Sequence, residues 1–154
     1  MITHYPTVPV EAARQMALLH KQDRLRPVVL VVDDEPIITE TLAAILNRSG
    51  LAAMTALNAR SAIETAALIP PEMLITDLAM PDMDGLDLAI EVKRTVPDCD
   101  IILFSGQASD SETLAKLRTT GRGFVTLPKP VHPADLLQRV FECLGRRGSV
   151  TMPA

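Results

Sequence analysis

The stretch VVLVVDD, residues 28–34, is a short apolar run that ends in two acidic residues. Three later runs follow the same plan, because each is short, largely apolar and followed at once, or after one proline, by a polar side chain. They are Met73–Thr76 before Asp77, Ile101–Phe104 before Ser105, and Phe124–Leu127 before Pro128 and Lys129. Such runs are typical of strands in a parallel sheet, which is buried on both faces. The carboxyl ends of parallel strands meet at one edge, so these polar side chains are predicted to share one crevice.

Helix-like segments alternate with these runs, and this alternation indicates βαβ units. A weaker, Ala-rich strand at residues 51–57 brings the number of units to five. We therefore predict an α/β fold of the doubly wound (βα)5 type, with a five-stranded parallel sheet and helices on both faces. The expected helices are Pro36–Arg48, Ala59–Leu68 after the capping residue Asn58, Leu86–Thr95, Asp110–Thr119 and a last helix that starts at Pro133.

The composition limits the class of protein. A chain of 154 residues with 47% hydrophobic and 22% charged residues is typical of one globular domain. Aromatic residues make up only 3%, so the core must be mainly aliphatic. The formal net charge of −4 disfavours direct binding to nucleic acid or to a membrane surface, since it does not attract phosphate groups. Cys99 and Cys143 match neither a disulfide framework nor a metal motif, which favours a reducing compartment.

We divide the chain into an N-terminal extension (residues 1–26), one domain (residues 27–145) and a short tail (residues 146–154). Residues 10–24 of the extension could form a helix, although a frayed or loosely packed segment is the favoured interpretation. The sequence contains no signal-peptide core and no run of membrane-spanning length. We therefore expect a cytoplasmic protein.

Each acidic or basic residue at a strand end also has a local explanation. Asp33 and Asp34 could cap the helix that starts at Pro36, where the helix dipole favours an anion. Asp77 could open a turn, and Lys129 could be an exposed lysine. The occurrence of all of them at strand ends of one sheet is harder to explain locally. Three carboxylates in one crevice repel one another, so the pattern favours a site for a hard divalent cation and a phosphoryl group.

Four motifs then carry a resemblance to a known family. They are VVDDEP (31–36), LITDLAMPDMDG (74–85), FSG (104–106) and KP (129–130). In this order and at these spacings they resemble the receiver domain of two-component response regulators, over most of the chain. The resemblance implies a stand-alone receiver with flavodoxin-like strand order, which signals without an output domain of its own.

The resemblance also implies the roles of the acids. Asp77 would be the phosphoacceptor, a carboxylate nucleophile that takes a phosphoryl group from a phosphohistidine and becomes an acyl phosphate. Asp33 and Asp34 would hold Mg²⁺, with Asp34 as a direct ligand and Asp33 acting partly through water. The backbone carbonyl of Ala79 would supply a further ligand. Mg²⁺ suits this set because it prefers oxygen ligands and is commonly shared between carboxylates and a phosphate.

The remaining motif positions would detect the phosphoryl group. Ser105 matches the hydroxyl that hydrogen-bonds it, and Lys129 matches the lysine that reaches it as a point charge. The peptide bond after that lysine is cis in the family, which Pro130 permits here. Many receivers carry an aromatic switch residue three places before the lysine, where this chain has Thr126. Phe124 could take the switch role together with Ser105, but a core position is favoured for it.

The expected partners are proteins. A histidine kinase or a histidine phosphotransfer protein would donate the phosphoryl group, and an unknown downstream protein would read the result. The family's usual contact surface falls on residues 111–119, 124–127 and 133–144. The resemblance also allows a phosphorylation-dependent dimer. The chain is expected to be a signalling domain and not an enzyme, although family members catalyse their own phosphorylation and dephosphorylation.

Two alternatives stay open at this point. A Mg²⁺-dependent phosphatase of the haloacid dehalogenase type also uses a strand-end aspartate, but it needs a second acid two residues later. Ala79 holds that place after Asp77; Glu35 holds it after Asp33, but the long cap and distal acidic motifs are lacking. The other alternative is a receiver-like interaction module that is never phosphorylated. It stays open because Thr126 occupies the position where many receivers have an aromatic switch residue.

Overall fold

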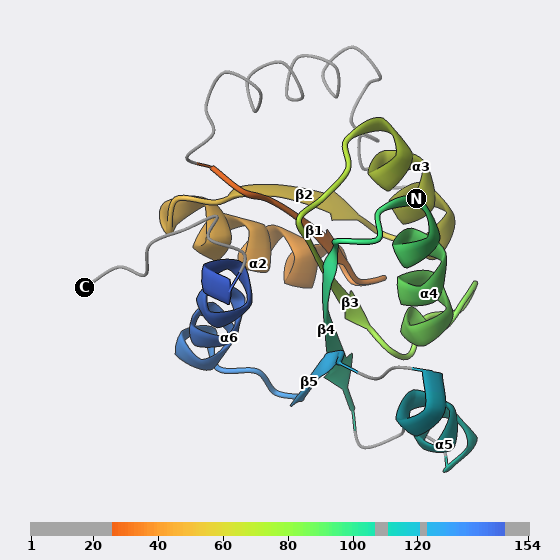
Figure 1. Ribbon diagram of the computed structural model, residues 1–154. Coiled ribbons are helices and arrows are strands. Elements are labelled where there is room, and N and C mark those ends of the chain that lie inside the picture. Colours follow the sequence, from red (N-terminus) through yellow and green to blue (C-terminus); the bar gives the residue numbers. More distant parts are fainter. Residues whose placement is uncertain (1–25, 107–110, 121–122, 147–154) are drawn as a thin grey trace, which may run out of the picture.

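The computed structural model describes residues 26–106, 111–120 and 123–146 (Figure 1). Strands and helices alternate along this part of the chain, as the sequence predicts. The strands are β1 (Val28–Val32), β2 (Ala52–Ala56), β3 (Met73–Asp77), β4 (Asp100–Ser105) and β5 (Val125–Pro128). The helices are α2 (Pro36–Arg48), α3 (Ala59–Leu68), α4 (Gly85–Thr95), α5 (Ser111–Thr120) and α6 (Pro133–Arg146). The helix considered at residues 10–24 and the tail from residue 147 lie outside the described residues.

The five strands form one parallel sheet in the order β2-β1-β3-β4-β5. This is the flavodoxin-like order, so the expected fold is confirmed. The strand order reverses between β1 and β3, and open α/β sheets bind ligands at the carboxyl side of that point. Val32 of β1 is in register with Thr76 of β3. Asp33 and Asp77 each follow one of these aligned residues, so the register brings them to the same level.

Helices cover both faces of the sheet (Figure 1), and each face has its own apolar cluster. Helices α3 and α4 pack on one face, against alternate residues such as Leu30, Leu74 and Leu103. Helices α2 and α6 pack on the other face, against Val31 and Ile75 among others. Both clusters are mainly aliphatic, as the low aromatic content requires.

Local signals explain where the helices begin. Asn58 caps α3 by accepting a hydrogen bond from the Ser61 amide at 2.8 Å, and Asp84 caps α4 in the same way through the Asp87 amide at 2.8 Å. Helix α2 starts with Pro36, which has no amide hydrogen to satisfy.

The two cysteines are free and buried, and they belong to the clusters on opposite faces of the sheet. Within the part of the chain that the structure describes, no helix combines the length and the apolar character that crossing a membrane would require.

Candidate functional site

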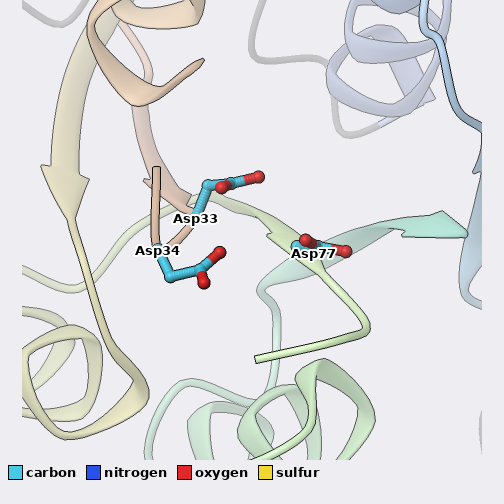
Figure 2. A group of neighbouring side chains, drawn as sticks. All are labelled: Asp33, Asp34 and Asp77. Carbon is cyan, nitrogen blue, oxygen red and sulfur yellow. The ribbon is translucent and has the colours of Figure 1, made fainter. Parts of the chain in front are cut away.

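Three carboxylates converge at the carboxyl ends of β1 and β3 (Figure 2). Asp33 and Asp34 follow β1, and Asp77 is the last residue of β3. One oxygen atom from each lies within 4.8 Å of the others, which is close enough for all three to bind one ion. Asp33 and Asp77 are 2% and 7% exposed, whereas Asp34 is open to solvent. The cluster therefore has two buried members and one exposed member.

Lys129, which follows β5, supplies a positive charge to this cluster. Its Nζ lies 2.8 Å from Oδ2 of Asp77 and 3.5 Å from Oδ2 of Asp33. The lysine amide donates to the Ser105 carbonyl at 3.0 Å, so the backbone ties it to the end of β4. The Lys129–Pro130 peptide bond is cis, the isomer that the resemblance implies. The ammonium group offsets part of the repulsion between the two buried carboxylates.

Both buried carboxylates also accept backbone hydrogen bonds. Oδ1 of Asp33 accepts from the Glu35 amide at 2.9 Å, and Oδ1 of Asp77 accepts from the Ala79 amide at 3.2 Å. The turn interpretation of Asp77 is therefore confirmed, and it is compatible with a site because the second oxygen faces Lys129. The capping interpretation of Asp33 and Asp34 is wrong. Glu35 is the N-cap of α2, and its side chain makes no capping hydrogen bond.

The surroundings change the acidity of two of these groups. Burial is the main cause that raises the pKa of Asp33 above its ordinary value; the Glu35 amide and Lys129 oppose the rise, and the charge of Asp77 adds to it. The pKa of Lys129 is also raised. Burial alone would lower it, but the hydrogen bond and the charge of Asp77, together with Asp33, outweigh that effect. Without a further cation, Asp33 is an unfavourable place for a negative charge, while Lys129 stays protonated.

The arrangement suits a hard divalent cation. The three side chains offer only oxygen atoms, which Mg²⁺ and Ca²⁺ prefer. A cation bound there would offset both the burial cost and the repulsion that raise the pKa of Asp33. Of the two carboxylates that contact Lys129, Asp77 is the nearer, at 2.8 Å from Nζ. A phosphoryl group on Asp77 would therefore lie beside a positive charge.

The other predicted residues occupy different places. Ser105 ends β4 at the same edge of the sheet and is half-buried. Thr126 is exposed on β5. Phe124 is partly buried and packs against the cluster that α3 and α4 cover, in line with a core position. The structure thus brings Asp33, Asp34, Asp77 and Lys129 within a few ångströms of one another, whereas Thr126 lies on the surface.

Sequence reasoning missed the structural part of Gly85, the first residue of α4. A Cβ atom at Gly85 would lie 2.1 Å from the carbonyl oxygen of Asp77 and 2.9 Å from its carbonyl carbon. The Gly85 amide donates to the Leu78 carbonyl at 2.9 Å, which closes the loop after β3. Only glycine fits this close approach. Its position in a turn-rich segment was the sole signal available, and a turn does not reveal which backbone it touches.

Comparisons with known proteins agree with this geometry. The family model of the response regulator receiver domain matches residues 29–141. The probable transcriptional regulatory protein TcrX of Mycobacterium tuberculosis is 32% identical over 124 residues, which cover 80% of this chain and 52% of TcrX. An uncharacterized 14.6 kDa protein of Leptolyngbya boryana is 33% identical over 122 residues, which cover 75% of this chain and 89% of that protein. The chain spans about half the length of TcrX and of the mycobacterial response regulators named MprA, which it also matches.

A solved structure shows the same fold. The signal receiver domain of an HD domain-containing protein from Pseudomonas fluorescens Pf-5 matches with a TM-score of 0.73 at 27% identity. The match covers 80% of this chain and 98% of that one.

Proposed function

This chain belongs to the family of response regulator receiver domains, and from that premise we propose that Asp77 accepts a phosphoryl group from a histidine kinase or a histidine phosphotransfer protein. One observation carries the proposal: the Asp77 carboxylate lies 2.8 Å from the Lys129 ammonium and within a cluster of three carboxylates whose oxygens approach within 4.8 Å. A carboxylate that could act as the nucleophile, a counter-charge and oxygen atoms that could bind a cation thus lie close together.

In the proposed transfer, one carboxylate oxygen of Asp77 attacks the phosphorus atom of a phosphohistidine. The new oxygen–phosphorus bond forms as the nitrogen–phosphorus bond breaks, and the leaving imidazole keeps the electron pair. Transfer of this kind needs positioning and charge neutralisation more than covalent help. Burial of Asp77 at the end of β3, and its hydrogen bond from the Ala79 amide, hold the nucleophile in place.

The metal would be held by the side chains of Asp33, Asp34 and Asp77 and by the backbone carbonyl of Ala79. Mg²⁺ bound there would neutralise charge on the phosphoryl oxygens. Asp33 acts partly through water in this proposal, since it already accepts the Glu35 amide and lies near Lys129.

Lys129 and Ser105 would detect the product. The ammonium of Lys129 bonds a phosphoryl oxygen, and the Ser105 hydroxyl donates a second hydrogen bond. Both residues are linked through the backbone bond between the Lys129 amide and the Ser105 carbonyl. Phosphorylation would therefore shift β4 and β5 together and alter the surface formed by α5, β5 and α6. A downstream protein, or a second copy of the domain, would read that surface.

The test is phosphorylation of the wild type and of Asp77→Asn by acetyl phosphate with Mg²⁺, followed by intact-protein mass spectrometry. We expect one phosphoryl group on the wild type and none on Asp77→Asn. Binding of beryllofluoride, measured by fluorine NMR, should need both Asp77 and Mg²⁺. Asp98→Asn is the matched control, because Asp98 is exposed in the segment that leads into the opposite end of β4.

Three outcomes would contradict the proposal. If Asp77→Asn is phosphorylated to the same extent as the wild type, the acceptor is a residue other than Asp77. A wild type that neither gains mass nor binds beryllofluoride would indicate an interaction module that is not phosphorylated. Steady release of phosphate from many phosphorylated substrates would indicate the hydrolase.

A further inference from the structure

Asp82, in the loop between β3 and α4, holds the start of a different helix. Its Oδ2 accepts hydrogen bonds from the amides of Ala59 at 3.0 Å and Arg60 at 3.3 Å, both in the first turn of α3. These residues are 23 and 22 positions away in sequence, so the contact joins two separate βα units. The carboxylate also suits the site, since the amino end of a helix favours an anion.

The first turn of α3 therefore has two capping side chains. Asn58 accepts the Ser61 amide at 2.8 Å from within the same βα connection, while Asp82 accepts the two preceding amides from outside it. Ala59 is fully buried, so Asp82 provides an acceptor for the amide of a residue inside the fold. Asp82 itself is exposed, so the contact is half-buried: it joins the amide of a buried residue to a carboxylate at the surface.

This contact also fixes the loop that follows the phosphoacceptor. The loop is closed at its base by the bond between the Gly85 amide and the Leu78 carbonyl at 2.9 Å. Met80 and Met83 pack against the apolar cluster on either side of Asp82. Helices α3 and α4 lie side by side on the same face of the sheet (Figure 1), and the Asp82 bonds tie the tip of the loop to α3.

We propose that Asp82 is a positioning residue of the metal site, which acts by holding the loop that carries Ala79, three residues earlier, whose backbone carbonyl is a ligand of the proposed Mg²⁺ site. This inference rests on the proposed Mg²⁺ site. Mg²⁺ demands near-ideal octahedral geometry, so a small displacement of one ligand weakens binding. Groups that orient metal ligands without touching the metal commonly change affinity by about tenfold or more.

Three variants of the full chain separate positioning from its alternatives. Asp82→Ala removes the acceptor and the charge, whereas Asp82→Asn keeps an acceptor oxygen without the charge. Asn58→Ala removes the other cap of the same helix and leaves the loop untouched. The Mg²⁺ dissociation constant of each is measured by titration with Mg²⁺ in proton–nitrogen NMR, and stability is measured by urea unfolding in Mg²⁺-free buffer.

Positioning predicts that Asp82→Ala binds Mg²⁺ about tenfold more weakly than the wild type. Asp82→Asn and Asn58→Ala should stay within about twofold of the wild type, because each leaves the loop tied to α3. Asn58→Ala and Asp82→Ala should lower the urea midpoint by similar amounts, since each removes a cap of α3.

Four results would overturn the inference. Unchanged Mg²⁺ affinity in Asp82→Ala would make Asp82 a helix cap only. Equal weakening in Asp82→Asn would assign the effect to charge, and equal weakening in Asn58→Ala would assign it to the stability of α3. A wild type that does not bind Mg²⁺ would overturn the proposed function as well, so the two failures are distinguishable.

Discussion

The acid-bearing end of the central strands and the flank formed by α5 and β5 are built differently. Every residue of β1 and β3 is buried, and the loop after β3 is pinned by hydrogen bonds at its base and its tip. In β5 only Leu127 is buried, and no described side chain of α5 is buried. Chemistry needs groups held in place, whereas a surface that changes on signalling must move at low cost. The contrast predicts that equivalent changes in the two regions have unequal effects.

The largest effect is expected from Gly85→Ala, which adds one methyl group beside the backbone of Asp77. The new Cβ would lie 2.1 Å from the Asp77 carbonyl oxygen, and a backbone atom of a buried strand cannot move aside easily. We expect a loss of about 4 kcal/mol in the free energy of unfolding, measured by urea unfolding with circular dichroism.

Gly106→Ala is the matched control for this prediction. Gly106 follows β4, where the chain leads toward the α5 flank, and among the described residues, its chain neighbours aside, no atom lies within 4 Å of a Cβ placed there. We expect a change within about 0.5 kcal/mol. Equal losses of unfolding free energy in Gly85→Ala and Gly106→Ala would show that the chain is packed no more closely at Gly85 than at Gly106.

A pair of leucines tests the packing contrast directly. Leu74 in β3 is fully buried, whereas Leu114 in α5 is 38% exposed. Leu74→Ala should cost about 3 kcal/mol, because it removes buried apolar contacts and leaves a cavity. Leu114→Ala should cost less than about 1 kcal/mol. Urea unfolding of both variants measures the difference, and a cost of Leu114→Ala as large as that of Leu74→Ala would contradict the contrast.

In Mg²⁺-free buffer, Asp33→Asn is expected to raise the free energy of unfolding, whereas the alanine variants above lower it. Burial raises the pKa of Asp33, so the folded state binds this proton more tightly than the unfolded chain does. Stability is therefore lost as the pH rises from the ordinary value of 3.8 through the raised folded pKa. At pH 7 the ionised group is a cost, and Asp33→Asn should be more stable than the wild type by about 1 kcal/mol.

The pH dependence identifies the cause of that gain. The difference between Asp33→Asn and the wild type should shrink as the pH falls through the raised folded pKa of Asp33 toward the ordinary value of 3.8, because the folded wild type then binds the proton. Saturating Mg²⁺ should reverse the order, because only the wild type keeps the full ligand set. Urea unfolding at several pH values, with and without Mg²⁺, tests both statements. A wild type more stable than Asp33→Asn in Mg²⁺-free buffer at pH 7 would show that burial of this charge is not a net cost.

Much of the fold could be predicted from the sequence, because each element carries its own local signal. Pro36 and Asn58 mark helix starts, and the run at residues 28–32 is apolar throughout, so the bounds of α2, α3 and β1 agree with the prediction. The convergence of Asp33, Asp34 and Asp77 could also be predicted, since parallel strands must place their carboxyl ends at one edge of the sheet. These inferences need only local patterns and one rule of topology.

The contacts that join distant segments could not be predicted in the same way. The bonds from Asp82 to α3 and the approach of Gly85 to Asp77 depend on how two βα units are placed relative to each other. Nothing local in either segment specifies the partner. The capping interpretation of Asp33 and Asp34 was wrong for a related reason. The pattern gives a suitable residue near a helix start, but the backbone path gives the N-cap to Glu35 and turns Asp33 toward Lys129.

The smallest effect concerns an ion pair that links the two contrasted regions. Lys116 of α5 hydrogen-bonds Oδ1 of Asp87, which lies two residues after Gly85 in the first turn of α4. The hydrogen bond to Asp87 is the main cause that raises the pKa of Lys116, with further help from the charges of Asp84 and Glu112. Lys116 is therefore protonated at neutral pH and loses its proton only as the pH rises through the raised pKa. Both side chains are about 40% exposed, so the pair should tie α5 only weakly to the fixed part of the molecule.

Lys116→Met should therefore leave global stability nearly unchanged and loosen α5 alone. We expect the amides of α5 to exchange with deuterium about threefold faster, with no change in α4, and high salt should produce the same effect in the wild type. Lys93→Met is the control, because Lys93 is at the far end of α4 and bonds the Pro97 carbonyl instead. Unchanged exchange in Lys116→Met would mean that α5 is held by its apolar contacts alone. Faster exchange limited to α5 would mean that the ion pair between Lys116 and Asp87 holds α5 to α4.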